Sequence, residues 1–260
     1  MKLTYSTENQ RNNYHSNSKR AFSGFPLSST DVKKTFDFAF EMCMGTGHHR
    51  AHRTGGQYDR SNGEKFCNTF QGKLAEIVLY NHFKSHGFDI KEPDFGVYGK
   101  GLWDDSDLEI NGKKINVKSA AFFSNLQLLE TRDWNTNGQY IPNLNTGTTS
   151  KYDYFVLVRI KPDLKSIFRE NNLFNGTIFE KDNIEATVTK QNFSADIAGY
   201  ITHTDLITVI ANRNILPQNS YLNGKVRMDA ENYYIQCGDM RVITDLVSEL
   251  KAMPQPQQAP

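Results

Sequence analysis

Apolar residues recur at helical spacing in residues 29–44, near the beginning of the chain. Residues three and four apart lie on one side of a helix, so this stripe predicts an amphipathic helix. Ser29 or Thr30 can cap its first turn, and a Gly-Thr-Gly sequence follows its end. The stripe consists of Val32, Phe36, Ala39, Phe40 and Cys43.

A second stripe of the same spacing predicts a longer helix, from Ser61 to about His86. Ser61 and Glu64 have the spacing of a capping box, and Gly87 follows the last turn. This stripe consists of Phe66, Phe70, Leu74, Ile77 and Val78.

The rest of the chain alternates between predicted strands and helices. The continuous apolar run at 152–160 predicts a buried strand, and residues 228–236 predict another. Helices are expected near 204–213 and at 242–252. Helices first, then strands with interspersed helices, indicate an α/β fold in which helices flank a central mixed β-sheet.

Composition divides the chain into three parts. Residues 1–28 are rich in Asn, Ser, Lys and Arg and are expected to form an irregular N-terminal arm. A single domain is expected over 29–252, of which 161–252 is the C-terminal part. The uncharged, Pro/Gln-rich residues 253–260 are expected to be a disordered tail.

Apolar and polar residues alternate on both sides of Asn111-Gly112, the dipeptide most typical of a two-residue type I′ hairpin turn. Counting outward from this turn, the two strands are expected to pair Leu108 with Ile115 and Asp107 with Asn116. One face of the hairpin is then apolar, with Leu108, Ile110, Ile115 and Val117. The other face is polar, with Asp107, Glu109, Lys114, Asn116 and Lys118.

Charge is unevenly distributed although the net charge is only +1. Residues 1–60 hold nine Lys and Arg against five Asp and Glu, together with four of the seven histidines. The rest of the chain carries an acidic excess, so a basic segment precedes an acidic cluster. This arrangement is typical of proteins that handle polyanions.

Other bulk features exclude several classes of protein. The cysteines at positions 43, 67 and 237 are widely spaced and odd in number, so neither a disulfide framework nor a structural zinc site is expected. This usage favours a reducing cytoplasm. No apolar run approaches the roughly 20 residues that a membrane-spanning helix needs, and the N-terminus lacks the apolar segment of a secretory signal.

The polar face of the hairpin brings together groups that could bind a cation. Asp107 and Asn116 offer oxygen atoms, and Lys118 follows two residues later on the same face. Glu76, on the preceding helix, is a further carboxylate that could point toward the same cation. Two other interpretations stay open. The hairpin face can be a solvated polar surface, and Glu76 can pair with Lys73, three residues earlier.

The sequence SDLEINGKKINVKSA, which contains Asp107 and the Asn116-Val117-Lys118 triplet, resembles the core of the PD-(D/E)xK restriction-endonuclease-like nucleases. In that family an Asp begins a hairpin, a (D/E)xK triplet lies on its second strand, and a preceding helix often adds a Glu. The resemblance covers 72–120 and extends loosely to 152–160. It implies a restriction-endonuclease-like fold with its catalytic core at about 61–160.

The chain departs from the family pattern at two positions. Ser106 precedes Asp107 where the family often has Pro, and the Pro-Asp pair of this region, Pro93-Asp94, lies earlier. Asp94 is therefore a reserve candidate for the first acid. Asn116 occupies the carboxylate position of the triplet. It is either a native neutral ligand, as in some family members, or a carboxylate removed by an inactivating replacement.

The resemblance implies hydrolysis of phosphodiester bonds with Mg²⁺, for which Mn²⁺ can substitute. The expected catalytic residues are Asp107, Asn116, Lys118 and Glu76. Lys118 is expected to orient or deprotonate the attacking water and to stabilise the transition state. The expected metal ligands are Asp107, Asn116, the Val117 carbonyl and Glu76, with Asp94 and Asp105 in reserve.

Two segments are candidates for DNA contact. A basic loop between the first two helices suits phosphate groups better than zinc, because its histidines lack the helical spacing and the glutamate of a zinc protease. The Asn- and Thr-rich stretch 124–150 could enter a groove, where amides pair with adenine and Arg with guanine; its aromatic residues could equally be packing anchors. The candidates are His48, His49, Arg50, His52, Arg53 and Arg60 in the loop, and Asn125, Gln127, Arg132, Asn135 and Asn137 in the stretch.

The function that the resemblance implies is a metal-dependent endonuclease acting on double-stranded DNA, most simply a sequence-specific type II restriction enzyme of a bacterium. Such enzymes usually act as homodimers, because a two-fold axis places two catalytic sites on a palindrome. Two alternatives stay open: a structure-specific repair or recombination nuclease, and a catalytically inactive DNA-binding protein of the same fold.

Overall fold

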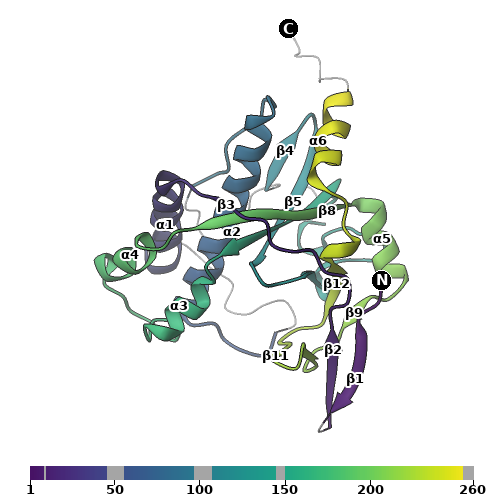
Figure 1. Cartoon of the computed structure of the whole chain (residues 1–260), viewed down its shortest axis with the longest axis horizontal. Helices are drawn as coiled ribbons and strands as arrows, with labels where there is room; N and C mark the ends of the chain where they lie inside the picture. The colour runs from purple at the N-terminus through teal and green to yellow at the C-terminus, as the bar shows by residue number, and fades with distance from the viewer. Residues whose placement is uncertain (9, 46–55, 97–106, 145–149, 254–260) are drawn as a thin grey trace.

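The computed structural model describes residues 1–8, 10–45, 56–96, 107–144 and 150–253. Its centre is a 5-stranded mixed sheet with the strand order β3-β8-β7-β5-β4 (Figure 1). β5 and β7 are parallel, and the other neighbouring strands are antiparallel. The strands are β3 (Phe25–Pro26), β4 (Leu108–Ile110), β5 (Lys113–Ala121), β7 (Tyr154–Lys161) and β8 (Ser194–Thr202).

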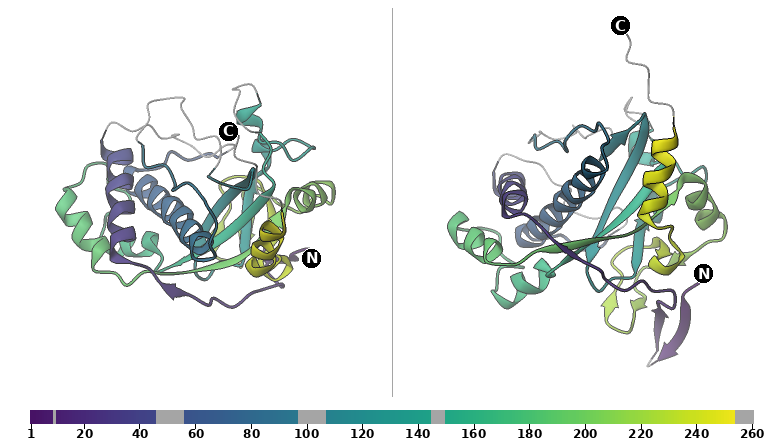
Figure 2. Two further views of the ribbon diagram at one scale, coloured as in Figure 1. Left: turned by 90° about the horizontal axis from the view of Figure 1, so that it is seen from above. Right: turned by 45° about the horizontal axis from the view of Figure 1, so that its top comes forward.

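Helices flank both faces of this sheet (Figure 2), which confirms the predicted α/β class. α1 has the predicted bounds, but its cap is Ser28, whose side chain accepts the Asp31 N–H at 3.0 Å, rather than Ser29 or Thr30. α2 begins after Ser61 as predicted. The helices are α1 (Ser29–Met44), α2 (Asn62–Ser85), α3 (Leu164–Glu170), α4 (Lys181–Thr189), α5 (His203–Ala211) and α6 (Ile243–Ala252).

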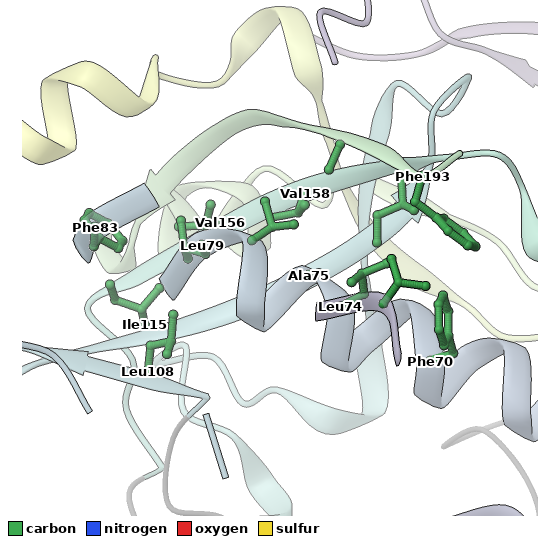
Figure 3. Packing of buried hydrophobic residues seen from close by; sticks show 14 of the residues in the cluster. Phe70, Leu74, Ala75, Leu79, Phe83, Leu108, Ile115, Val156, Val158 and Phe193 are labelled. Atoms are coloured by element: carbon green, nitrogen blue, oxygen red, sulfur yellow. The ribbon is translucent and has the colours of Figure 1, made fainter. Parts of the chain in front are cut away.

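α2 covers one face of the central sheet because its apolar stripe matches the apolar face of the β4–β5 hairpin. Figure 3 shows Leu79 of α2 near Leu108 and Ile115, and all three side chains are at most 3% exposed. Burying an aliphatic side chain of this size contributes roughly 1.5–3 kcal/mol. This first core therefore holds the hairpin in place and leaves its polar residues on the opposite side.

The opposite face of the central sheet is covered by α5 and by a second, 3-stranded sheet with the order β6-β12-β9. Trp134 lies edge-to-face on Phe155 of β7, with ring centroids 5.2 Å apart, inside this second core. The three strands are β6 (Leu126–Glu130), β9 (Ile215–Leu216) and β12 (Asn232–Gln236). Short 3-10 turns occur at Thr131–Asp133, Ile141–Asn143 and Cys237–Asp239.

Residues 1–28 are not the irregular arm that their composition predicts. They contribute β3 to the central sheet and two strands to a 4-stranded sheet with the order β1-β2-β10-β11. The side chain of Gln236 anchors the chain between them, since its Oε1 accepts the backbone N–H groups of Asn17 and Ser18. The strands of this sheet are β1 (Thr4–Glu8), β2 (Arg11–His15), β10 (Tyr221–Leu222) and β11 (Val226–Arg227).

At the other end of the chain, Met253 packs against the first core, although it was included in the expected tail. Residues 254–260 lie outside the described part of the chain. Among the helices that the structure describes, none combines the length and the apolar character needed to cross a membrane.

Candidate metal and phosphate site on the β4–β5 hairpin

The β4–β5 hairpin has the predicted turn and register. Asn111 and Gly112 both have positive φ angles, 50° and 73°, as a type I′ turn requires. Leu108 pairs with Ile115, which is the predicted partner. Counting one step further outward brings Asp107 to the level of Asn116, just beyond the last paired residue of β4.

Asp107, the residue before β4, contacts the backbone of β5 through its carboxylate. Its Oδ2 atom accepts the Val117 N–H at 2.6 Å. In an uninterrupted antiparallel ladder that N–H would bond a β4 carbonyl, because alternate residues of β5 point their backbone groups toward β4. The side chain of Asp107 is thereby held against the backbone of β5. A carboxylate has about four lone-pair positions, and this contact occupies one of them.

The carbonyl group of Val117 points to the side of β5 on which Asp107 lies. The N–H and C=O groups of one strand residue extend to the same side, and the Val117 N–H is directed at Asp107. The backbone of Lys114, three residues earlier on β5, points the opposite way, since its carbonyl accepts the Asp153 N–H at 2.8 Å on the β7 side. The Val117 carbonyl, the predicted ligand, is thus directed to the β4 side of β5 rather than into the β5–β7 ladder.

Asn116 is buried on the face of the sheet that α2 does not cover. It pairs in register with Phe155, a residue of the second core, and side chains in register point to the same side. Its side chain is 6% exposed, yet Oδ1 has no hydrogen-bond partner in the described part of the chain. Burying an unsatisfied polar atom costs about 1–3 kcal/mol, and a ligand to Oδ1 would remove that cost.

Lys118 lies on the same face as Asn116, as the alternation predicts, and pairs in register with Leu157. It is half-buried, and within the described residues it makes no ion pair. Asn116 and Lys118 are two residues apart on β5, so their side chains share a face of the sheet. The structure therefore places Asn116 and Lys118 on one face of β5 and directs the Asp107 carboxylate to the Val117 N–H between them.

Glu76 is placed differently from these hairpin residues. It forms an ion pair with Lys73, three residues earlier on α2, which is the pairing that the sequence left open. The Lys73 amine also lies 5.0 Å from the centroid of the Phe38 ring. α2 covers the apolar face of the hairpin, whereas Asn116 and Lys118 lie on the other face. No described contact joins Glu76 to them.

Of the two reserve acids, the structure describes only Asp94. Asp94 closes a tight turn, since its Oδ1 accepts the Gly96 N–H at 2.7 Å. Asp105 lies outside the described residues.

The predicted DNA contacts differ in their exposure and in the bonds that they make within the fold. Arg132 and Asn137 are exposed and accessible to a ligand, whereas Gln127 is fully buried in β6 opposite Ile235, which corrects its assignment to a DNA groove. Asn125 and Asn135 use their side-chain oxygens within the fold, on the N–H groups of Arg20 and Gln139. Arg60 is half-buried. The candidates outside the described residues are His48, His49, Arg50, His52 and Arg53.

The donor set of the hairpin fits a hard cation better than zinc. It offers a carboxylate, an amide oxygen and a backbone carbonyl, which are the ligands of Mg²⁺ and Ca²⁺. No group of three or more His, Cys, Asp and Glu residues that could hold a metal occurs among the described residues. An ion at this site would therefore depend on Asn116 and on water molecules as well as on Asp107.

The three cysteines are poor candidates for a catalytic or metal-binding site. Burial raises the pKa of the Cys43 and Cys237 thiols to about 11, so both stay protonated at neutral pH. Burial raises the pKa of Cys67 still further. A protonated, buried thiol is a poor nucleophile and a poor metal ligand.

Comparison with protein-family models finds no match to this chain, and comparisons with curated proteins and with solved structures find no match either.

Proposed function

We propose that this protein is a Mg²⁺-dependent endonuclease that hydrolyses phosphodiester bonds of double-stranded DNA at the edge of β5. One observation carries the proposal. A buried and unsatisfied amide oxygen of Asn116 lies on the same face as the amine of Lys118, and the Asp107 carboxylate contacts the Val117 N–H between them. The resemblance of this hairpin to the PD-(D/E)xK pattern supports the same chemistry.

Each residue has a separate task in this proposal. Mg²⁺, when bound, acts as a Lewis acid and lowers the pKa of a coordinated water. Asp107 supplies the negative charge that attracts the ion, and Asn116 and the Val117 carbonyl supply neutral oxygen ligands. Lys118 orients the attacking water and stabilises the charge that develops on the phosphate oxygens. The ion pair of Lys73 with Glu76 leaves that carboxylate an outer role, on a water or on a second ion.

The finer proposal is a type II restriction enzyme that acts as a homodimer on a specific DNA sequence. It rests on the resemblance and on the two-fold symmetry that double-strand cleavage favours. Digestion of a long DNA of known sequence with Mg²⁺, followed by sequencing of the ends, tests it. Discrete fragments with one common end sequence are expected. Cleavage only at branched or damaged sites would indicate a structure-specific nuclease instead.

The Lys118→Ala variant tests the site itself. We expect DNA binding to persist while cleavage falls by about 100-fold or more, since Lys118 acts on the transition state rather than on the bound substrate. Lys161→Ala is the matched control, because Lys161 is the exposed last residue of the neighbouring strand β7. Cleavage by Lys118→Ala at the wild-type rate would place the catalytic site elsewhere.

A second candidate function is DNA binding without catalysis, and the neutral side chain of Asn116 favours it. The Asn116→Asp variant separates the two. A carboxylate at this position adds charge to the ion site, so a nuclease should keep or gain Mg²⁺-dependent activity. A decrease would show that the amide itself is required. If neither the wild-type protein nor Asn116→Asp cuts DNA with Mg²⁺ or Mn²⁺, the non-catalytic function is correct.

A further inference from the structure

The 4-stranded sheet formed by β1, β2, β10 and β11 is separate from the central sheet that carries the β4–β5 hairpin, and Figure 1 shows β1, β2 and β11 far from β4. One side of the sheet carries Tyr14 and Leu222, which pack against the neighbouring core. The register places Asn13, Tyr221 and Arg227 in one row on the other side. Residues in register share a face, so these side chains point away from that core.

Arg11 joins this row on the same side of the sheet. It lies two residues before Asn13 on β2, so the strand alternation gives both the same direction. Its guanidinium carbon lies 5.0 Å from the centroid of the Tyr221 ring, which confirms that direction. Arg11, Asn13, Tyr221 and Arg227 are called the arginine face below.

Both arginines of this face are exposed and are positioned by neutral groups. Arg227 donates from Nη2 to Asn219 Oδ1 at 2.8 Å and from Nη1 to the Tyr58 hydroxyl at 3.3 Å. Arg11 is positioned by the Tyr221 ring. The register partner of Arg11 on β1 is Glu8. Among the side chains that the structure describes, no carboxylate forms an ion pair with either guanidinium. A guanidinium that is positioned but not neutralised keeps its charge and several N–H donors for an anionic ligand.

Two residues that follow the predicted basic loop in sequence also contact this sheet. Gln57 and Tyr58 directly follow the predicted basic loop in sequence, and both contact the region of β11. The Gln57 N–H donates to Asp229 Oδ1 at 2.9 Å, so this nearby carboxylate already has a partner. The described positive charge of the arginine face comes from Arg11 and Arg227, which lie near opposite ends of the sequence and meet through the pairing of β2, β10 and β11.

We propose that the arginine face is a duplex-DNA-binding surface, a site in addition to the hairpin and to the segments predicted from sequence. The inference rests on the proposed nuclease function and identifies where the substrate is held. Exposed arginines suit the closely spaced phosphates of a duplex, and small β-sheets can approach a DNA groove. Arg11 and Arg227 contact phosphates, and Tyr221 keeps Arg11 extended.

The test compares two double variants of the full chain that remove the same charge. Arg11→Gln/Arg227→Gln changes the arginine face, and Lys190→Gln/Lys251→Gln changes exposed lysines on α4's C-cap and on α6. Binding to a short mixed-sequence duplex is measured by fluorescence anisotropy, with Ca²⁺ in place of Mg²⁺ to prevent cleavage. The arginine variant should bind about tenfold more weakly or worse, and its plot of log affinity against log salt should be shallower by about 2. The lysine variant should match the wild-type slope.

Three outcomes would overturn the proposal: wild-type affinity and slope in the arginine variant, an equal loss in the lysine variant, or no binding of duplex DNA by the wild-type protein. Preference for RNA or for an acidic protein over duplex DNA would also overturn it. Unfolding midpoints of both variants should equal that of the wild type, because the replaced side chains are exposed. Arginine-dependent binding without any cleavage would refute the nuclease function alone, and cleavage with an unchanged KM in the arginine variant would refute this surface alone.

Discussion

Arg159 and Asn116 are both buried polar residues of the central sheet, and they differ in how their polar atoms are satisfied. Arg159 is fully buried, and every nitrogen of its guanidinium has an acceptor. Its Nε and Nη2 atoms bond the Asp196 carboxylate at 2.9 and 2.5 Å. Asn116 is almost as buried, but its Oδ1 has no partner among the described residues.

The difference separates a structural group from a candidate functional one. The remaining donors of Arg159 bond the carbonyl groups of Arg20 and Ala21, so this ion pair fastens the segment between β2 and β3 to the central sheet. Every guanidinium nitrogen of Arg159 is therefore engaged within the fold and not with a ligand. The Asn116 oxygen fastens no described segment, and a buried polar atom without a partner calls for an explanation such as a bound water, an ion or a catalytic role.

The largest effect is expected from Asn116→Leu, which keeps the shape of the side chain and removes its oxygen. If Oδ1 is a ligand atom, DNA cleavage with Mg²⁺ should fall by about 100-fold or more. Stability should stay equal or rise by about 1 kcal/mol, because the variant no longer buries an unsatisfied acceptor. Cleavage rates and urea unfolding measure the two properties.

We thus expect Asn116→Leu to lower the rate of DNA cleavage without lowering the free energy of unfolding. A variant that unfolds more easily than the wild type would show that Asn116 supports the fold instead. Unchanged cleavage would remove it from the ion site.

Arg159→Met should show the reverse pattern, with a large loss of stability and little change in cleavage per folded molecule. Removing one partner of a buried ion pair leaves the other charge unpaired, at a cost of about 3–5 kcal/mol. Asp196 would be that charge, and it would keep only the Ser23 N–H at 2.9 Å. The free energy of unfolding in urea measures the loss.

The double variant Arg159→Met/Asp196→Leu is the control for this prediction. It removes both charges, so part of the lost stability should return. A single variant that loses less than about 1 kcal/mol would place this pair among ion pairs of little energetic consequence.

Local patterns predicted the parts of the fold that local chemistry determines. The α1 and α2 helices follow from their apolar stripes, and the hairpin register follows from Asn111-Gly112, because a two-residue turn leaves one way to pair the strands. The same register correctly placed Asn116 and Lys118 on one face. These features depend on residues that are close together in sequence.

Long-range contacts account for what could not be predicted. β2 has few apolar residues and is stabilised by β10, a strand near the other end of the chain, so nothing in its own sequence marked it. Gln127 has a polar side chain of a kind that is usually exposed, yet it is buried where β6 pairs with β12. The contact of Asp107 with the Val117 N–H also depends on where β4 begins, which the alternation did not define.

His82 extends the comparison to a buried polar atom that can take up a proton. Burial is the main cause that lowers the pKa of His82 to about 4, and the neighbouring His86 lowers it further. Its Nε2 is buried without a partner among the described residues. An unfolded histidine has a pKa of about 6.5, so between about pH 6.5 and pH 4 the unfolded state binds more protons than the folded state.

Stability should therefore be fully present above about pH 6.5 and should decrease as the pH falls toward 4. Thermal unfolding midpoints at a series of pH values, for the wild type and for His82→Gln, measure this contribution. The variant should lose less stability over that interval, and His86→Gln should lie between the two because it removes only the smaller cause. Identical pH profiles for the wild type and His82→Gln would mean that His82 titrates normally in the folded protein. Its ring nitrogen would then be accessible to water, unlike the oxygen of Asn116.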